Sequence, residues 1–212
     1  MLSRVLPLTL LTAALVAPGE PHAQTRRRRG APVFAVPRPA ERTRARRLGL
    51  GTREAAHTLL FDRPRASWVV AAQGRPTRRY LWPVINGILT QGFDGQHGAH
   101  RALDIGAPCG TPIRAAHAGL VGYSEAFGNT GNIVVLIHPG GWVSAYGHTR
   151  RTLVAAGARV RRGQPIAEIG DTGDAHGCHV HFILYRNGTR LDPEPLMNGR
   201  PRASGRSRIA RP

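Results

Sequence analysis

From residue 80 onward, short apolar runs alternate with turns rich in glycine and proline. Turn-forming pairs such as Arg162-Gly163 and Asn187-Gly188 separate the runs, which show no helical period. The runs cover residues 82–84, 112–116, 120–123, 132–137, 142–146, 165–169 and 180–185. Short runs with this spacing predict an all-β domain over residues 80–197.

The N-terminus carries the features of a secretory signal. Arg4 precedes an apolar stretch from Val5 to Ala17, which is followed by Pro18 and Gly19. A membrane-spanning helix needs about 20 apolar residues, so this stretch is too short to cross a bilayer. We expect a signal peptide over residues 1–23 and hence an exported protein. The alternative is an apolar N-terminal helix of a cytosolic protein.

Arginine and proline dominate the segment between the signal and the β domain. Arginine clusters repel themselves and offer little apolar surface to bury, so residues 24–55 are expected to form a disordered arm. Residues 55–79 contain several apolar side chains and are expected to pack against the domain as a helix or strand. We therefore expect a partly disordered arm or linker over residues 24–79. The final residues, 198–212, predict a basic disordered tail.

The distribution of charge narrows the choice of partners. The formal net charge is +18, and all 30 basic residues are arginine. Residues 1–79 hold 16 of these arginines against 4 acidic residues, so most of the excess precedes the β domain. A basic segment of this size attracts polyanions. Because export argues against a specific nucleic acid, we expect anionic wall or envelope polymers to bind the arginine-rich arm. A linker with no binding role is the alternative.

Histidines supply the candidate chemistry. His179 and His181 lie in an apolar run, and residues i and i+2 of a strand point to the same face. His100 and Asp104 lie in a glycine-rich stretch, and His148 ends another apolar run. A catalytic zinc site uses three protein ligands and leaves one position for water. His100, Asp104 and one histidine of the later pair would supply them, which leaves two histidines for proton transfer and oxyanion stabilisation. Spacing alone does not decide which histidine of the pair is the ligand.

These residues belong to a series of motifs that resembles a known family. The sequence resembles the M23 peptidases, the lysostaphin and LytM type of cell-wall endopeptidase. The segment His100–Asp104 is similar to the HxGxD motif of this family, with Ala102 where glycine is usual. If that position needs a positive φ, alanine strains it by roughly 1 kcal/mol. Further similar segments lie in order within residues 80–197: Gln91–Phe93, Gly110–Ile113, Ala115–Val121, Gly131–Val135, Tyr146–His148, Val160–Ile166, Gly170–Gly173 and His179–Phe182.

The resemblance implies a fold, a cofactor and a set of roles. It implies an antiparallel β-sheet scaffold with an open groove that holds one Zn²⁺ ion. His100, Asp104 and His181 are the implied zinc ligands, and His148 and His179 are the implied catalytic pair. The implied protein is a monomeric, secreted zinc endopeptidase, a hydrolase that cuts peptidoglycan peptides in the periplasm or the extracellular cell wall.

Two cysteines, Cys109 and Cys178, flank the segments that carry the implied ligands. Cysteines of an exported protein usually pair, and some members of the family carry cysteines at similar places. We expect a Cys109–Cys178 disulfide that ties the ligand loop to the ligand strand; a free thiol near the metal is the alternative.

Of the remaining histidines, His97 and His176 are expected at the rim of the site, with a second metal site as the alternative. His138 is expected to be a packed or turn-capping residue.

Two other functions compete with this one. A non-catalytic relative would act as a wall-binding or amidase-activating module, but such relatives typically lack zinc ligands, and all five implied site residues are present here. A polyanion-binding protein would use the β domain only as a scaffold, which the zinc-site residues argue against. The sequence does not indicate which peptidoglycan bond is cut, whose wall is the target, or whether residues 24–79 cover the groove.

Overall fold

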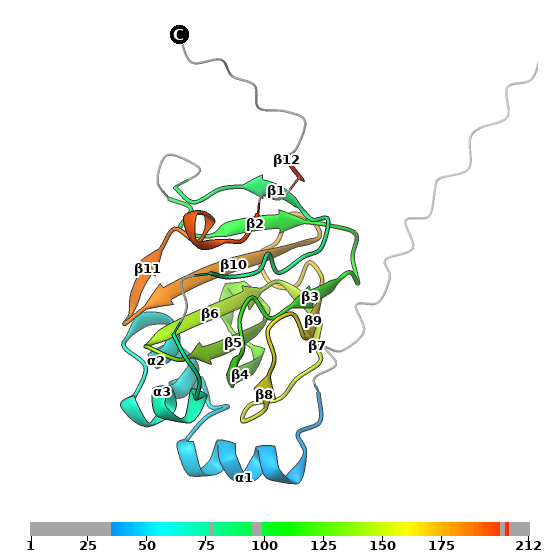
Figure 1. The fold of residues 1–212 in the computed structure, drawn as a ribbon. Helices are drawn as coiled ribbons and strands as arrows, with labels where there is room; N and C mark the ends of the chain where they lie inside the picture. The colour runs from blue at the N-terminus through cyan, green and yellow to red at the C-terminus, as the bar shows by residue number, and fades with distance from the viewer. Residues whose placement is uncertain (1–34, 77–78, 95–98, 200–201, 204–212) are drawn as a thin grey trace, which may run out of the picture. The chain divides into compact units, whose positions relative to one another are not determined.

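The fold is that of a computed structural model, which describes residues 35–76, 79–94, 99–199 and 202–203 (Figure 1). The predicted signal peptide lies outside these ranges, and so does His97. Among the described residues, no helix is both long enough and apolar enough to span a membrane. Two short 3₁₀ helices cover Gly128–Thr130 and Glu194–Leu196.

Nine strands form the main sheet, which confirms the predicted β-sheet scaffold. The strand order is β12-β1-β2-β10-β6-β5-β4-β8, and β11 pairs with β10 beside this path. Neighbouring strands are antiparallel except β1 and β12, which are parallel. The strands are β1 (Ile88–Gln91), β2 (Leu103–Gly106), β4 (Gly119–Ala126), β5 (Asn132–His138), β6 (Trp142–Gly147), β8 (Arg159–Val160), β10 (His179–Arg186), β11 (Thr189–Leu191) and β12 (Arg202–Ala203).

A second, three-stranded sheet packs on one face of the main sheet. Its order is β3-β9-β7, with bounds Pro112–Arg114, Pro165–Ile169 and Thr149–Thr152. Buried side chains of both sheets form one apolar cluster, to which the small sheet contributes Ile113 and Ile166 and the main sheet Val134 and Leu136.

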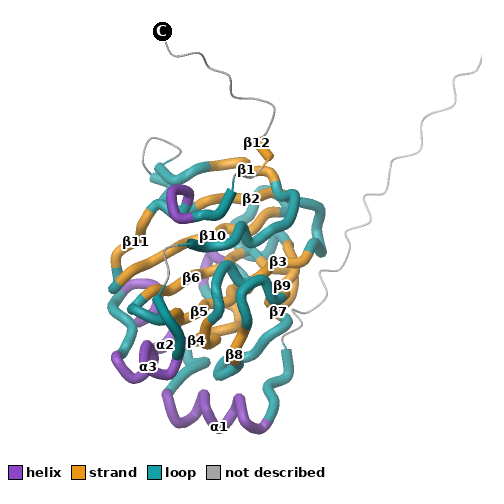
Figure 2. Tube along the Cα trace, viewed as in Figure 1, coloured by secondary structure: helices purple, strands orange, loops and turns teal. Residues whose placement is uncertain are grey.

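Three α-helices precede the described strands, and α2 and α3 cover the opposite face of the main sheet. They are α1 (Pro39–Leu48), α2 (Arg53–Phe61) and α3 (Ala66–Ala72). Leu59 of α2 and Trp68 of α3 are fully buried and belong to the same apolar cluster as Ile133 and Val135 of β5. Figure 2 shows these helices in purple in the lower part of the molecule, away from β1 and β2.

The double covering explains why β5 is apolar at successive positions. Ile133 and Val135 pack on the helical side, whereas Val134 and Leu136 pack on the side of the small sheet. Successive residues of a strand point to opposite faces, so a strand that is covered on both faces has few places for polar residues. All seven residues of β5 are buried.

The disordered arm expected over residues 24–55 is wrong for residues 39–48, which form α1, and for the start of α2. The backbone N–H of Arg38 donates to the Glu41 carboxylate at 2.8 Å, and Pro39 occupies the first turn, where proline is tolerated. Gly49 ends α1 with a φ of 64°. Because arginine is a good helix former, this capped segment folds despite its charge.

The basic tail expected over residues 198–212 also requires a correction. Residues 202–203 form β12, in which Arg202 lies opposite Ile88 of β1. These two residues therefore extend the main sheet at its edge. Residues 200–201 and 204–212 lie outside the described part of the chain.

Candidate metal centre

Three neighbouring strands of the main sheet carry most of the predicted site residues. Asp104 of β2 lies opposite His181 of β10, and Gly147 of β6 lies opposite His181 on its other side. His179 precedes His181 by two residues, and His148 directly follows β6. Since residues i and i+2 share a face of a strand, the pairing of β2, β10 and β6 gathers these side chains.

His100, Asp104 and His181 form a compact group of potential metal ligands. One ligand atom from each residue lies within 4.8 Å of the other two. Asp104 lies between the two rings: its Oδ2 is 3.1 Å from Nε2 of His100, and its Oδ1 is 2.8 Å from Nδ1 of His181. Imidazole nitrogens and a carboxylate oxygen are the ligands that zinc takes in three-ligand sites.

The environment of His100 supports a metal ion at this point. Its Nδ1 donates to the carbonyl oxygen of Gly92 at 3.0 Å, so Nε2 is the unprotonated nitrogen of the neutral ring. This Nε2 atom is buried and has no hydrogen-bond partner among the described residues. A buried polar atom without a partner costs roughly 1–3 kcal/mol, and a bound metal ion removes that cost. The donor set therefore fits a metal ion.

Asp104 is in the ionised form that a ligand requires. Burial raises the pKa of Asp104, but the hydrogen bond from His181 and the charges of the surrounding histidines outweigh burial. The pKa of this carboxyl group consequently lies below its usual value. A carboxylate must be deprotonated to bind a metal, so Asp104 needs no proton release at neutral pH.

His148 and His179 form a second pair beside this group, with ring centroids 4.8 Å apart. Nδ1 of His148 donates to the carbonyl oxygen of Thr172 at 2.8 Å, and Nδ1 of His179 donates to that of Gly177 at 2.9 Å. In each neutral ring, Nε2 is left as the proton acceptor. Nε2 of His179 lies 3.8 Å from Oδ1 of Asp104, so the pair adjoins the potential ligands.

The backbone of His148 has an unusual conformation, with a φ of 58°. Positive φ is uncommon outside glycine, and such strain clusters at functional sites. The backbone N–H of His148 donates to the carbonyl oxygen of Thr130 at 2.9 Å, which helps to hold this conformation. Burial is the main reason that the pKa of His148 lies below its usual value, although the hydrogen bond to Thr172 acts in the opposite direction. His148 is therefore a neutral base at neutral pH.

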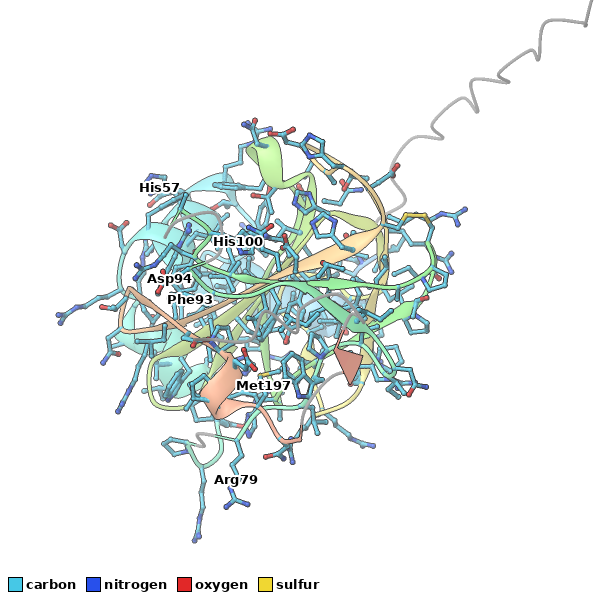
Figure 3. The ribbon with its side chains drawn as sticks, turned by 90° about the horizontal axis from the view of Figure 1, so that it is seen from above. His57, Arg79, Phe93, Asp94, His100 and Met197 are labelled. Atoms are coloured by element: carbon cyan, nitrogen blue, oxygen red, sulfur yellow. A yellow bond between two sulfur atoms is a disulfide. The ribbon has the colours of Figure 1, made fainter. Side chains whose placement is uncertain are left out.

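A groove of about 560 Å³ contains all five of these side chains. His176, which was expected at the rim, also lines this groove. In Figure 3, His100 lies near Phe93 and Asp94, and the backbone N–H of Asp94 donates to the carbonyl oxygen of His100 at 2.7 Å. The other residues that line the groove are Thr90, Gln91, Gly106, Asp174, Gly177 and Cys178.

The predicted disulfide between Cys109 and Cys178 is present, with Cα atoms 5.3 Å apart. It is the yellow bond in Figure 3. The two cysteines are separated by 69 positions, and on the chain-entropy model a loop of this length contributes about 4 kcal/mol to stability. Because Cys178 directly precedes His179, the bond ties the connection after β2 to the start of β10.

The structure also shows the environments of Ala102, His138 and Thr172. Ala102 is buried in the apolar cluster that contains Leu59 and is not among the described non-glycine residues with positive φ, so it carries no such backbone strain. His138 is fully buried and packed, with Nδ1 donating to the carbonyl oxygen of Ala118 at 2.8 Å. Thr172 lies in a family-like motif, but no sequence feature indicated that its carbonyl oxygen orients His148.

The fold and the groove together define a class of protein. A β-sheet scaffold that presents two histidines and an aspartate as a ligand group, with two further histidines beside them, has the arrangement of a metallohydrolase. Residues 98–193 match the profile of Peptidase family M23.

Curated proteins and solved structures agree with this match. The chain is 35% identical over 131 residues to the uncharacterized lipoprotein YgeR of Escherichia coli, covering 61% of this chain and 50% of that protein. It is 41% identical over 102 residues to the peptidoglycan DD-endopeptidase ShyC of Vibrio cholerae, covering 48% of this chain and 24% of that protein. It is 33% identical over 126 residues to the murein hydrolase activator EnvC of Escherichia coli, covering 58% of this chain and 30% of that protein.

A crystal structure of a putative peptidase M23 from Pseudomonas aeruginosa is 30% identical, with a TM-score of 0.55, and the match covers 74% of this chain and 62% of that one. The profile match over residues 98–193 and this structural likeness support membership of peptidase family M23. The matched region spans half or less of the length of these three curated relatives.

Proposed function

We propose that this protein is a zinc-dependent endopeptidase that hydrolyses peptide bonds in the stems or cross-bridges of peptidoglycan. The observation that carries this proposal is the presence in one groove of both a three-residue ligand group and a separate histidine pair. The match to the profile of a peptidase family supports it, and so does the likeness to ShyC, which is named a peptidoglycan DD-endopeptidase.

His100, Asp104 and His181 would hold Zn²⁺ through two imidazole nitrogens and one carboxylate oxygen. Bound zinc lowers the pKa of water towards about 7 and polarises a carbonyl group. The protein prepares this group before any ion binds, because Asp104 is ionised and the carbonyl oxygen of Gly92 fixes the tautomer of His100. This preparation supports a role for the three residues as ligands.

His148 and His179 would move the protons of the reaction. Their Nδ1 atoms are occupied by carbonyl oxygens, so each Nε2 is free to accept a proton. One of the two rings would take a proton from the attacking water at its Nε2. The other ring, when it carries a proton on Nε2 as well as on Nδ1, would donate a hydrogen bond to the carbonyl oxygen as negative charge develops there. The short separation of the rings lets both act on one peptide bond.

We further propose that the protein works in the cell envelope, in the periplasm or the extracellular wall. The relative YgeR is named a lipoprotein, and ShyC and EnvC carry names that refer to peptidoglycan or murein. The arginine-rich segment before α1 would bind anionic wall or envelope polymers, which its charge attracts. We propose a monomer that has no specific nucleic acid partner.

A non-catalytic wall-binding or amidase-activating module is the second candidate. It is favoured by the likeness to EnvC, which is named a murein hydrolase activator. The complete set of five groove residues favours the enzyme, because binding alone does not require two oriented imidazoles beside a ligand group.

Substitution of the histidine pair tests the proposal. His148→Ala and His179→Ala should each retain bound zinc and lose turnover by about 10²–10⁴-fold, since proton transfer is lost while the ligands stay. Metal content and hydrolysis of a purified muropeptide are measured on the same samples. His57→Ala, an exposed histidine on α2, serves as the control and should change neither. Near-normal turnover in both groove variants would reject this assignment.

A further inference from the structure

The loop between β9 and β10 forms one wall of the groove, and Asp174 is part of this wall. The loop is held firmly at this point. The backbone N–H of Asp174 donates to the carbonyl oxygen of Asn129 at 2.8 Å. Gly173 has a φ of 73°, and a Cβ atom there would lie 2.3 Å from the same carbonyl oxygen, so only glycine allows this close approach. The backbone of Asp174 is therefore held in place before a ligand binds.

The side chain of Asp174 has no partner among the described residues. Other carboxylates near the site are engaged: Asp94 pairs with Arg101 at 3.3 Å, and Asp104 lies among the histidines. Asp174 is exposed to solvent, and no hydrogen bond or ion pair of its carboxylate occurs within the part of the chain that the structure describes. In a protein with 30 arginines and 12 acidic residues, an unpaired carboxylate in the groove is available to a ligand.

The high positive charge of the whole chain does not cancel this local negative charge. At physiological ionic strength, charges separated by more than about 8 Å are largely screened from one another when they face solvent. The groove residues around Asp174 are histidines, glycines and neutral polar side chains, together with Asp104, which the ligand group engages. A small cation that reaches this wall therefore meets a carboxylate that no described side chain engages.

We propose that Asp174 binds a primary ammonium group of the peptide substrate, so that this protein prefers peptides with a free amine near the cleaved bond. The inference rests on the proposed function. Peptidoglycan peptides offer such a group in two places, at a free N-terminus and on the side chain of a diamino acid. Both present the same chemistry, a donor of three hydrogen bonds with one positive charge. Asp174 selects between substrates and takes no part in bond cleavage.

Matched peptides test this preference on the full chain loaded with zinc. One stem peptide is prepared with both amines free, with only the side-chain amine acetylated, and with only the N-terminal amine acetylated. For the wild-type protein, one of the two acetylations should lower kcat/KM by about two- to fivefold, which is the usual effect of an exposed ion pair. Asp174→Asn should lower kcat/KM by the same factor for the free peptide and leave the sensitive acetylated peptide unchanged.

Asp192→Asn serves as the control, because Asp192 is an exposed carboxylate outside the groove lining, and it should cleave all three peptides as the wild type does. Equal cleavage of all three peptides by the wild type would overturn the inference, and so would an equal loss on every peptide in Asp174→Asn. Calorimetric binding of the same peptides separates this inference from the proposed function. If no peptide is cleaved but acetylation or Asp174→Asn still weakens peptide binding two- to fivefold, only the enzymatic proposal fails. If neither acetylation nor Asp174→Asn changes the affinity for the peptides, the inference is overturned.

Discussion

Thr172 connects His148 to the first residues of β5 and β7 through its main chain and its side chain. Its carbonyl oxygen accepts the Nδ1 proton of His148, and its hydroxyl donates to the carbonyl oxygen of Thr149 at 2.9 Å. The same hydroxyl accepts the backbone N–H of Asn132 at 3.0 Å. The hydroxyl thus sets the position of the carbonyl oxygen that orients His148. Thr172 is a positioning residue, because it is not one of the residues that line the groove.

Replacement of this hydroxyl tests the positioning role. Thr172→Val keeps the shape of the side chain but leaves the N–H of Asn132 and the carbonyl oxygen of Thr149 without these partners, at a cost of roughly 1–3 kcal/mol in stability. We expect kcat to fall more than KM, and Thr172→Ser to restore both. Thr43→Val, on exposed α1, is the matched control. Unchanged kcat in Thr172→Val would show that the hydroxyl does not position His148.

His138 lies in a polar network within the core. Its Nδ1 donates to the carbonyl oxygen of Ala118, so Nε2 of the neutral ring accepts the hydroxyl proton of Ser144 at 2.8 Å. The hydroxyl oxygens of Ser144 and Tyr146 are 3.0 Å apart, and that of Tyr146 also accepts the backbone N–H of Ala116. Burial lowers the pKa of His138 to about 4 from its usual 6.5. Burial thus keeps the ring neutral, although the hydrogen bond to Ala118 acts in the opposite direction.

This shifted pKa predicts a loss of stability in acid. Below pH 6.5 the unfolded chain binds a proton at His138 that the folded chain takes up only near pH 4. The free energy of unfolding should therefore fall between these two values, by up to about 3 kcal/mol from this residue. Urea unfolding of the metal-free protein at pH 7, 5 and 4 measures the effect. His138→Asn should show a smaller fall, and an equal fall in both proteins would contradict the assignment.

At the scale of elements, α2 and α3 complete the core instead of extending from it. They cover the face of β4 and β5 that the small sheet leaves open, and Leu59 and Trp68 are fully buried there. Cβ of Gly122, if present, would lie 2.5 Å from Cδ1 of Leu59, so α2 packs directly on β4. The segment before the β domain is therefore part of the fold from α1 onward.

Core and surface substitutions in these helices distinguish packing from a loosely attached arm. Leu59→Ala should lower the free energy of unfolding by about 2–5 kcal/mol, because it leaves a cavity in a buried cluster. Val70→Ala, in α3, changes a side chain that is 76% exposed and should stay within about 0.5 kcal/mol of the wild type. Urea unfolding followed by circular dichroism measures both. Equal, small effects would mean that the helices do not support the sheet.

The strands and the shared face of His179 and His181 were predictable from short local patterns, whereas the choice of His181 as the ligand rested on the resemblance to a family. A period of two places His179 and His181 on one face, and turn residues mark the ends of the apolar runs. The sequence predicts disorder for α1 because of its charge, and that prediction is wrong; α2 and α3 agree with the expectation that residues 55–79 pack against the domain as a helix or strand. Because successive residues of β5 are apolar, the sequence indicates that both faces of this strand are covered. The pattern does not indicate which segment of the chain covers the second face. Contacts such as that of Thr172 with His148 depend on tertiary structure and have no sequence period.

At the scale of the whole molecule, the site lies on strands that several parts of the chain hold together. The small sheet and the helices cover the two faces of the main sheet, and the disulfide ties the connection after β2 to the start of β10. Such support keeps catalytic side chains in one geometry, which proton transfer and metal binding both require.

Digestion of isolated sacculi tests the central claim most directly. The purified, zinc-loaded chain is incubated with sacculi, and the released fragments are identified by mass spectrometry. We predict fragments with new amino and carboxyl ends within the peptides, which identify the bond that is cut. A chelator and His181→Ala should each abolish this release. Absence of such fragments from several kinds of sacculi, with zinc bound to the protein, would contradict the enzymatic account and favour a module that only binds the wall.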